Sequence, residues 1–232
     1  TLEATGGVDT ATAAQLIRID GKTSVNVAAG NVELINNSNL TQMSAVLTAH
    51  TGAGSIVLDG DYDVTLTGTY DESNIPALNA IAADTTGTVT ASFNNLNAAQ
   101  ADTLTTASDD AITITLEVGT TTTTVLSNID ATTSVTVGAQ AVTGITGSIT
   151  DITSVRNAPG ITIDTDYNAS VTGNLVNADI SNLNALADET SGIITATLIN
   201  VSATEADVIS TNNNDLIAIT LTNTLNSSDI TK

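Results

Sequence analysis

Two kinds of hydrophobic spacing take turns along the chain. In some short runs hydrophobic and polar residues alternate, as Val89, Ala91 and Phe93 do with Thr and Ser. In other runs hydrophobic residues recur every three or four positions, as Ile75 and Leu78 do. The first spacing is typical of strands with one buried face, and the second of short amphipathic helices. The chain is therefore predicted to alternate strands with short helices.

The spacing sets the expected boundaries of these elements. The predicted strands are Ser24–Val27, Ser55–Leu58, Asp61–Thr69, Thr88–Phe93, Ala111–Val118, Ser134–Val137, Ile161–Asp164, Ile193–Ile199 and Leu216–Thr222. The predicted helices are Ala11–Asp20, Leu40–His50, Asp71–Asp84, Ala98–Ser108, Thr122–Asp130, Ile149–Asn157, Asp179–Asp188 and Ala203–Thr211. Gly87 and Gly192 are expected to end the helices that precede them.

A long internal repeat organises these elements. Asp59–Leu116 matches Asp164–Leu221 without a gap, at a constant offset of 105 residues and with 24 of 58 positions identical. Repetition at a fixed long period is the mark of a repeat architecture. We divide the chain into a partial repeat (1–58), a full repeat (59–163) and a partial second repeat (164–232) within one continuous array. The likeness of Thr1-Leu2-Glu3 to Thr115-Leu116-Glu117 indicates a segment of a longer protein.

The predicted fold class is an α/β repeat. Strand centres recur about every 22 to 33 residues, a spacing found in solenoid repeats. Successive strand–helix units would coil into an elongated, right-handed parallel solenoid, four coils to a period. This layout is similar to that of leucine-rich repeats, although the leucine-rich consensus is absent. The alternative is a tandem array of immunoglobulin-like β-sandwiches with the same 105-residue period. The helical spacing between strands favours the solenoid.

Composition limits the choice of core and partner. Hydrophobic residues make up 41% of the chain, yet it has one Phe, three Tyr and no Trp, which favours a thin core of many small layers. The net charge of -21 argues against partners with phosphate backbones or anionic membrane surfaces. No cysteine is present, so disulfides and thiolate metal sites are excluded. No run approaches the roughly 18 apolar residues of a membrane span, so no membrane insertion is expected.

Three phrases carry a resemblance to a known group of proteins. Ala13–Asp20, Leu78–Gly87 and Ile129–Val137 resemble the Thr-, Ala- and Asp-rich tandem repeats of giant bacterial surface proteins, particularly cyanobacterial and adhesin-like ones. The resemblance implies an extracellular, cell-surface location and a structural or adhesive role. It also suggests self-association, either with identical chains or with neighbouring repeats. The Gly-Gly-x-Gly-x-Asp calcium repeats of such proteins do not occur here.

Outward-pointing Thr side chains form the main candidate binding face. Stacked about 4.8 Å apart in a parallel sheet, their hydroxyl and methyl groups could contact a glycan, ice or another chain. The alternative is that Thr serves only as a good polar strand former. The predicted face consists of Thr65, Thr67, Thr90, Thr113, Thr115, Thr136, Thr162, Thr195 and Thr197.

Alternating Asp residues form a candidate metal site. Asp59, Asp61 and Asp63 recur as Asp164 and Asp166, with Asn168 in place of the third. Alternate carboxylates place several hard oxygens on one side of an extended chain, which suits calcium. The alternative is an acidic turn between two strands. No other cofactor is predicted.

No residue set favours catalysis. His50 is the single histidine, and neither Ser44 nor Asp59 nearby forms a recognisable triad with it. The acidic pairs Asp71-Glu72 and Asp109-Asp110 are expected to be solvated loop residues and helix caps. We therefore expect a structural segment of a filament, stalk or surface layer, or else an adhesive module, and not an enzyme.

Overall fold

The computed structural model describes residues 9–222, and the prediction about Thr1-Leu2-Glu3 lies outside that range. The chain divides into two compact units. One comprises the chain up to Thr115 together with Ile129–Val137, and the other comprises Leu116–Asn128 together with the chain from Gly138 onward.

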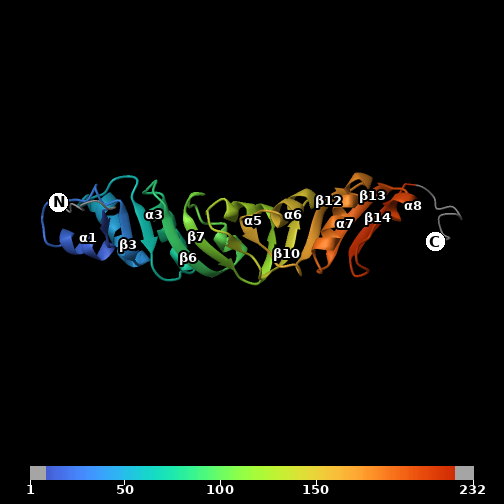
Figure 1. The fold of residues 1–232 in the computed structure, drawn as a ribbon, viewed down its shortest axis with the longest axis horizontal. Helices are drawn as coiled ribbons and strands as arrows, with labels where there is room; N and C mark the ends of the chain where they lie inside the picture. Colours follow the sequence, from blue (N-terminus) through green and yellow to red (C-terminus); the bar gives the residue numbers. More distant parts are fainter. Residues whose placement is uncertain (1–8, 223–232) are drawn as a thin grey trace. The chain divides into compact units, whose positions relative to one another are not determined.

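The first unit contains a parallel sheet built in chain order. Its strands are β1 (Thr10–Ala11), β2 (Val27–Ala28), β3 (Leu34–Ser38), β4 (Ile56–Val57), β5 (Asp63–Leu66), β6 (Val89–Leu96), β7 (Ala111–Leu116) and β9 (Val137–Gly138). The main sheet has the order β1-β3-β5-β6-β7 and continues into β9, while β2 and β4 pair separately. In Figure 1 the strands β3, β6 and β7 follow one another from blue to green.

The second unit repeats this arrangement. Its strands are β8 (Gly119–Thr122), β10 (Val142–Gly147), β11 (Ile161–Thr162), β12 (Asn168–Leu175), β13 (Ile194–Val201) and β14 (Leu216–Leu221). The sheet runs β8-β10-β12-β13-β14, the same succession as β1-β3-β5-β6-β7 in the first unit. The strands β13 and β14 begin 105 residues after β6 and β7. The 105-residue repeat of the sequence therefore corresponds to a repeated order of strands in the two sheets.

The strand pairing confirms the α/β class. All pairs whose register is defined are parallel, and paired residues lie between 20 (Val201 with Leu221) and 29 (Leu34 with Asp63) positions apart. Parallel neighbours need a crossover between them, and here the crossover contains a short helix. The sandwich alternative does not fit, because immunoglobulin-like sheets are antiparallel.

Helices follow most of the main strands. They are α1 (Ala13–Asp20), α2 (Leu40–Leu47), α3 (Ile75–Ala82), α4 (Ala98–Ala101), α5 (Thr123–Asp130), α6 (Ile149–Arg156), α7 (Ile180–Glu189) and α8 (Ala203–Ala206). A π-helical turn, η1 (Thr48–Ala53), extends α2, and 3-10 turns η2 (Glu72–Asn74) and η3 (Asn177–Asp179) precede α3 and α7. None of the helices within residues 9–222 is long and apolar enough to cross a membrane.

Reciprocal caps start several of the helices. Asn39 accepts a hydrogen bond from the backbone N of Gln42 (2.9 Å), and the Gln42 side chain accepts one from the backbone N of Asn39 (3.1 Å). Thr12 with Gln15, Asn97 with Gln100 and Ser202 with Glu205 form the same capping box. Each box satisfies two N–H groups that a helix start leaves without partners. This explains how helices of one or two turns begin at defined residues.

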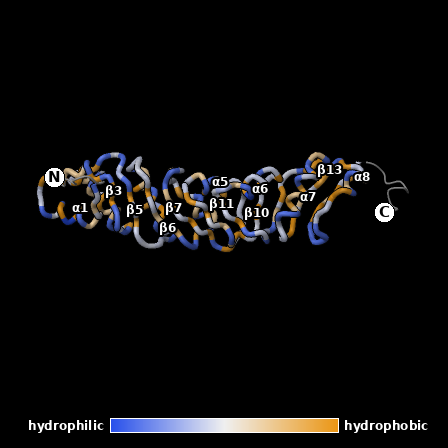
Figure 2. The backbone as a smooth tube through the Cα atoms, in the orientation of Figure 1, coloured by the Kyte–Doolittle hydropathy of each residue, from blue (hydrophilic) through white to orange (hydrophobic). Residues whose placement is uncertain are grey.

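The core of each unit consists of small layers of buried side chains. Along β6, Val89, Ala91 and Phe93 are buried, and along β7 so are Ile112 and Ile114. Figure 2 shows hydrophobic and hydrophilic positions alternating along the tube. Aliphatic side chains predominate in the core, as the composition predicts, and burying them supplies most of the driving force for folding.

Several predictions about elements were wrong. The strands β1, β3, β8, β10 and β12 were not predicted, and the Asn-, Thr- and Gly-rich sequences of the last four hide the strand pattern. The predicted helices Ala98–Ser108 and Ala203–Thr211 shorten to one turn each, α4 and α8. The helix α4 ends early because of Asn79, whose side chain donates to Thr103 O (2.9 Å) and accepts from Thr105 N (3.0 Å). Asn79 thereby satisfies the extended backbone that would otherwise continue the helix.

Asn184, 105 residues later, makes the same two hydrogen bonds to the backbone that follows α8. Its side chain donates to Val208 O and accepts from Ser210 N, both at 2.9 Å.

Gly87 and Gly192 have a different role from the one predicted. A Cβ at Gly87 would lie 2.5 Å from both Asp61 O and Tyr62 O, and one at Gly192 would lie 2.1 Å from Tyr167 O. These glycines permit the close approach of two backbones rather than ending a helix by a left-handed conformation.

Replacing Gly87 by Ala should lower the free energy of unfolding by about 1–3 kcal/mol, because the added methyl group overlaps main-chain atoms that cannot rotate away. Urea unfolding followed by circular dichroism measures the change. Gly30→Ala is the matched control, since nothing lies within 4 Å of its Cβ position; it should change stability by about 0.5 kcal/mol or less. Equal losses in the two variants would contradict this assignment.

Candidate functional site

The predicted Thr face is exposed but divided among several strands. Thr65 of β5 lies beside Thr90 of β6 in the sheet register. Thr136 instead precedes the short strand β9, and Thr162 lies in β11. Thr67, Thr113, Thr115, Thr136, Thr162 and Thr195 are exposed, and Thr65, Thr90 and Thr197 are half-buried. The structure therefore places these residues on the surface without joining them in a single row.

A row of hydroxyl residues that the sequence analysis missed crosses the second sheet. Thr122 of β8 pairs with Thr146 of β10, Thr146 pairs with Ser170 of β12, and Ser170 pairs with Thr195 of β13. Thr122, Ser170 and Thr195 are exposed, and Thr146 is half-buried. Only Thr195 was predicted, because β8, β10 and β12 had not been identified as strands.

The hydroxyl row offers evenly spaced polar groups to solvent. Neighbouring strands of a sheet lie about 4.8 Å apart, so the four side chains form a ladder of that spacing. The Thr122 hydroxyl already accepts a hydrogen bond from Val125 N at 3.2 Å. The remaining three hydroxyls are able to donate or accept toward a ligand or another chain.

The Asp turns hold the backbone locally. Asp59 accepts from Gly60 N and Asp164 accepts from Thr165 N, both at 2.8 Å. Asp63 accepts from Thr88 N at 2.7 Å, while Asp61 and Asp166 are exposed. Asn168 repeats the Asp63 contact by accepting from Ile193 N at 2.8 Å. Within the described part of the chain, no three His, Asp or Glu side chains lie close enough to hold a metal ion. The calcium site stays a prediction.

Asp110 corrects the prediction for the Asp109-Asp110 pair. Asp110 is 3% exposed, and its carboxylate accepts hydrogen bonds from Val89 N and from Ala107 N, both at 2.7 Å. Asp215 repeats both contacts with Ile194 N and Asn212 N, again at 2.7 Å. A buried carboxylate is tolerated here because backbone donors replace water.

Asp71 of the other acidic pair is the cap that was predicted. Its Oδ1 accepts from Ser73 N at 3.0 Å at the start of η2.

A buried tyrosine cluster also escaped the sequence analysis. Tyr62 is fully buried, and its hydroxyl donates to Asp84 Oδ2 at 2.6 Å. His50 Nε2 lies 3.9 Å from the same oxygen, and His50 Nδ1 lies 3.0 Å from Ile56 O. Thr85 closes the cluster by donating to Tyr62 O at 2.6 Å. His50 thus contacts a carboxylate at a helix end, and the neighbouring group is a phenol.

The second copy of the cluster is built differently. Tyr167 and Glu189 lie 105 residues after Tyr62 and Asp84, and Thr190 donates to Tyr167 O at 2.5 Å. The buried Tyr167 hydroxyl has no hydrogen-bond partner within residues 9–222, and Arg156 is the basic residue near it. Burial raises the pKa of both tyrosines. Beside Tyr62 the Asp84 carboxylate raises the pKa further. Beside Tyr167 the Arg156 charge lowers the pKa and the Glu189 charge raises it.

These clusters fasten one strand–helix unit to the next. A phenol with a raised pKa stays protonated, so it does not act as a nucleophile, and Tyr62 donates a hydrogen bond to Asp84. The Tyr hydroxyl and the Thr hydroxyl join elements more than 20 residues apart. The shared offset of 105 between the tyrosines was the signal that could have revealed them from sequence.

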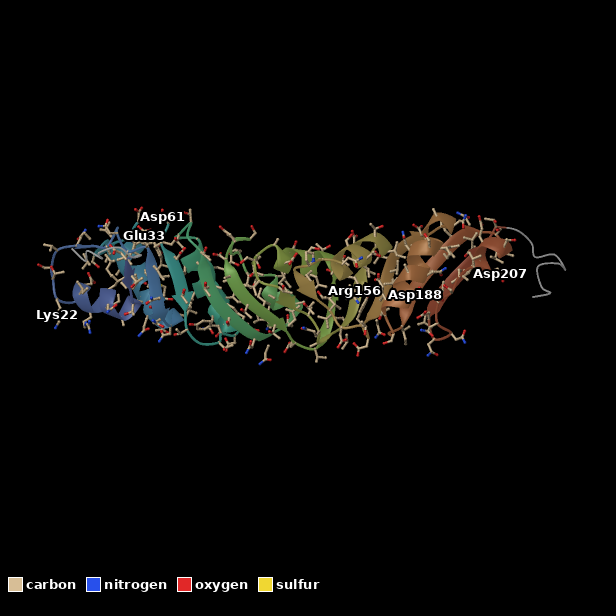
Figure 3. The ribbon with its side chains drawn as sticks, in the orientation of Figure 1. Lys22, Glu33, Asp61, Arg156, Asp188 and Asp207 are labelled. Carbon is tan, nitrogen blue, oxygen red and sulfur yellow. The ribbon has the colours of Figure 1, made fainter. Side chains whose placement is uncertain are left out.

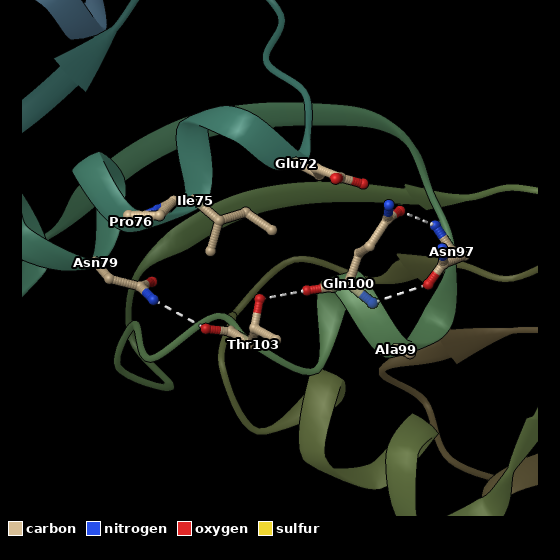
Figure 4. Close-up of a pocket in the computed structure, with 8 residues that line it drawn as sticks. All are labelled: Glu72, Ile75, Pro76, Asn79, Asn97, Ala99, Gln100 and Thr103. Atoms are coloured by element: carbon tan, nitrogen blue, oxygen red, sulfur yellow. Dashed lines mark hydrogen bonds between the residues drawn. The ribbon is translucent and has the colours of Figure 1, made fainter.

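A shallow hollow lies between α3 and α4. Glu72, Ile75, Pro76, Asn79, Asn97, Ala99, Gln100 and Thr103 line it. Figure 4 shows Asn97 and Gln100 bonded to each other and Asn79 bonded to Thr103. Most of its polar groups therefore hold the chain itself.

Stability should fall as the pH rises above about 10. The unfolded chain then loses the phenolic protons of Tyr62 and Tyr167, whereas the folded chain keeps them because their pKa values are raised. The stabilisation is complete below the unfolded pKa and is lost by up to about 1.4 kcal/mol per pH unit and tyrosine.

Urea unfolding at about pH 8 and about pH 11 measures this loss. Tyr62→Phe and Tyr167→Phe each remove one titrating group and should each make the loss smaller. The same alkaline loss in the wild type and both variants would contradict the assignment.

Comparison with known proteins leaves the chain without an assigned relative: no family model, no curated protein and no solved structure matches it.

Proposed function

We propose that the chain is a structural segment of a secreted cell-surface protein. In this proposal the 105-residue periods stack as one elongated strand–helix solenoid within a filament, stalk or surface layer. The observation that supports it is the repetition of one strand order, β1-β3-β5-β6-β7 and β8-β10-β12-β13-β14, with parallel pairing wherever the register of two neighbouring strands is defined. The role is to span distance, and the proposal assigns the chain no enzymatic reaction.

The contacts between consecutive units favour a continuous stack. In the first unit Asn79, Thr85 and Asp110 each bond to backbone groups more than 20 residues away. In the second unit Asn184, Thr190 and Asp215 do the same. A unit that depends on its neighbours for its hydrogen bonds is stable only within an array, as in other repeat proteins. The repeats 1–58, 59–163 and 164–232 would then be successive parts of that array.

The surface charge supports a solvated, extracellular role. Glu33 and Asp61 in the first unit and Asp188 in the second are exposed (Figure 3). With a net charge of -21, the chain repels other acidic surfaces at low ionic strength and stays soluble. Association with an identical chain or a neighbouring repeat would therefore be strongest where salt screens the charge.

Small-angle X-ray scattering tests the solenoid. A compact chain of this length has a radius of gyration of about 17 Å. We expect a clearly larger value for the single chain, because stacked units extend along one direction. Data extrapolated to zero concentration remove the effect of association. A single chain as compact as a globular protein would contradict the proposed array.

The hydroxyl row supports a second candidate function, adhesion. Thr122, Thr146, Ser170 and Thr195 lie on adjacent strands and present hydroxyl groups at sheet spacing. Glycans, whose hydroxyl groups both donate and accept, are the partners that such a row would suit best. Ice and another chain are the alternatives.

A panel of immobilised glycans tests the adhesive candidate. Binding by the wild type should fall at least about tenfold on Ser170→Lys or Thr195→Lys, corresponding to one or more lost hydrogen bonds. Thr162→Lys is the control, since Thr162 is also exposed but lies outside the row. Equal binding by all these proteins, or no binding by the wild type, would contradict the adhesive function.

A further inference from the structure

The backbone N–H groups of buried strand residues point toward the strand–helix segment that follows in the sheet. In the first unit, Val64 N donates to Thr88 O at 2.9 Å and Val89 N donates to Asp110 Oδ1 at 2.7 Å. Ile112 N, next in the series, donates to Thr133 Oγ1 at 3.0 Å. Each strand therefore depends on the unit that follows it for an acceptor.

The same series runs through the second unit. Ala169 N donates to Ile193 O at 2.9 Å, and Ile194 N donates to Asp215 Oδ1 at 2.7 Å. Ile217 of β14 corresponds to Ile112 at the offset of 105. Within residues 9–222 no acceptor corresponding to Thr133 lies beyond Ile217.

The segment that completes β7 is a compact turn, Ile129–Val137. Its Thr133 hydroxyl contacts both Ile112 N (3.0 Å) and Ile112 O (2.7 Å). Ser134 N donates to Asp110 O at 2.8 Å. Thr133 is 6% exposed, so this contact is dry.

The chain contains a second copy of that turn near its beginning. Ile19–Val27 is identical to Ile129–Val137 at six of nine positions, including Thr23 for Thr133 and Ser24 for Ser134. The backbone is held alike in both. Lys22 N donates to Ile19 O (2.9 Å), as Thr132 N does to Ile129 O (3.1 Å).

The capping hydroxyl is held alike as well. Val25 N donates to Thr23 Oγ1 (3.1 Å), as Val135 N does to Thr133 Oγ1 (3.0 Å). Ile19–Val27 is therefore preformed for the contact that Ile129–Val137 makes.

The two surfaces that would form this contact are both exposed. Thr23 and Ser24 are exposed, and Val25 is 71% exposed. On β14, Ile219 is 44% exposed, whereas its counterpart Ile114 on β7 is 1% exposed. Leu216 adds to the apolar area with 63% exposure. Apolar side chains of this size at a sheet edge mark an interaction surface.

We propose that the turn Ile19–Val27 of one chain docks on β14 of a second copy, reproducing the internal contact between Ile129–Val137 and β7. Thr23 Oγ1 accepts from Ile217 N of the second copy, and Ser24 N donates to Asp215 O. The two surfaces are different, so the contact is head-to-tail and leaves one of each free at the ends of every assembly. This inference rests on the proposed structural function and names the surface through which segments join.

Sedimentation velocity of the full chain over a range of concentrations tests the docking. The wild type should form a series of species of increasing mass at moderate ionic strength, where the charge of -21 is screened. Val25→Asp places a charge on the docking turn, and Ile219→Asp places a charge on the docking strand, so each substitution blocks one of the two surfaces. Each variant alone should remain a single chain.

A mixture of the two variants identifies the geometry. Val25→Asp retains an intact β14, and Ile219→Asp retains an intact turn, so together they should form a species of two chains and no larger one. Val118→Asp and Ile193→Asp are the matched controls, since these side chains are 73% and 43% exposed and lie outside the proposed surface. Both controls should associate as the wild type does.

Several outcomes would overturn the docking. One is a wild type that remains a single chain at all concentrations. Another is association that Val25→Asp or Ile219→Asp leaves unchanged, which would place the contact elsewhere. A third is slow hydrogen exchange at Ile217 N in the single chain, which would show that the chain's own residues cover β14. An elongated chain that does not associate would overturn the docking alone, whereas a compact single chain would overturn the solenoid proposal as well.

Discussion

The backbone N–H groups of the buried residues in each strand find their hydrogen-bond acceptors in the strand–helix segment that follows. Val64, Val89 and Ile112 all direct their N–H groups toward the next unit. A buried N–H without an acceptor costs about 1–3 kcal/mol, so every strand needs a partner in the next unit. Where the next strand is in register, a carbonyl serves, as Thr88 O does for Val64. Where no carbonyl is in register, a side-chain oxygen accepts instead, as Asp110 does for Val89 and Thr133 does for Ile112.

This requirement explains the polar residues in the core. Asp110 and Thr133 are both buried, and each bonds to backbone groups of the preceding strand. Thr85 and Thr190 instead accept from their own following glycine and donate to a tyrosine carbonyl. A buried hydroxyl or carboxylate of this kind is stable because its hydrogen bonds replace those lost to water. The periodic polar core is therefore part of the stacking mechanism.

The two copies of the period share these side-chain hydrogen bonds to the backbone. Asn79 and Asn184 bracket the backbone in the same way, and Asp110 and Asp215 accept the same pair of bonds. The tyrosine clusters differ in the basic side chain beside the acid, which is His50 in one, while Arg156 lies near Tyr167 in the other. Shared backbone contacts with variable electrostatics suit an array that keeps one architecture while its units diverge.

The period of 105 residues, the alternation of strands with short helices and the buried faces of β6, β7 and β13 follow from the sequence alone. They do so because hydrophobic spacing within a strand or helix is a local property. Only the tertiary structure identified β1, β3, β8, β10 and β12, shortened α4 and α8 to one turn and buried Asp110. It also assembled the hydroxyl row across β8, β10, β12 and β13 and the cluster of Tyr62 with Asp84. Each of these features depends on a partner more than 20 residues away, and a pattern of neighbouring residues carries no record of which distant backbone group a side chain will meet.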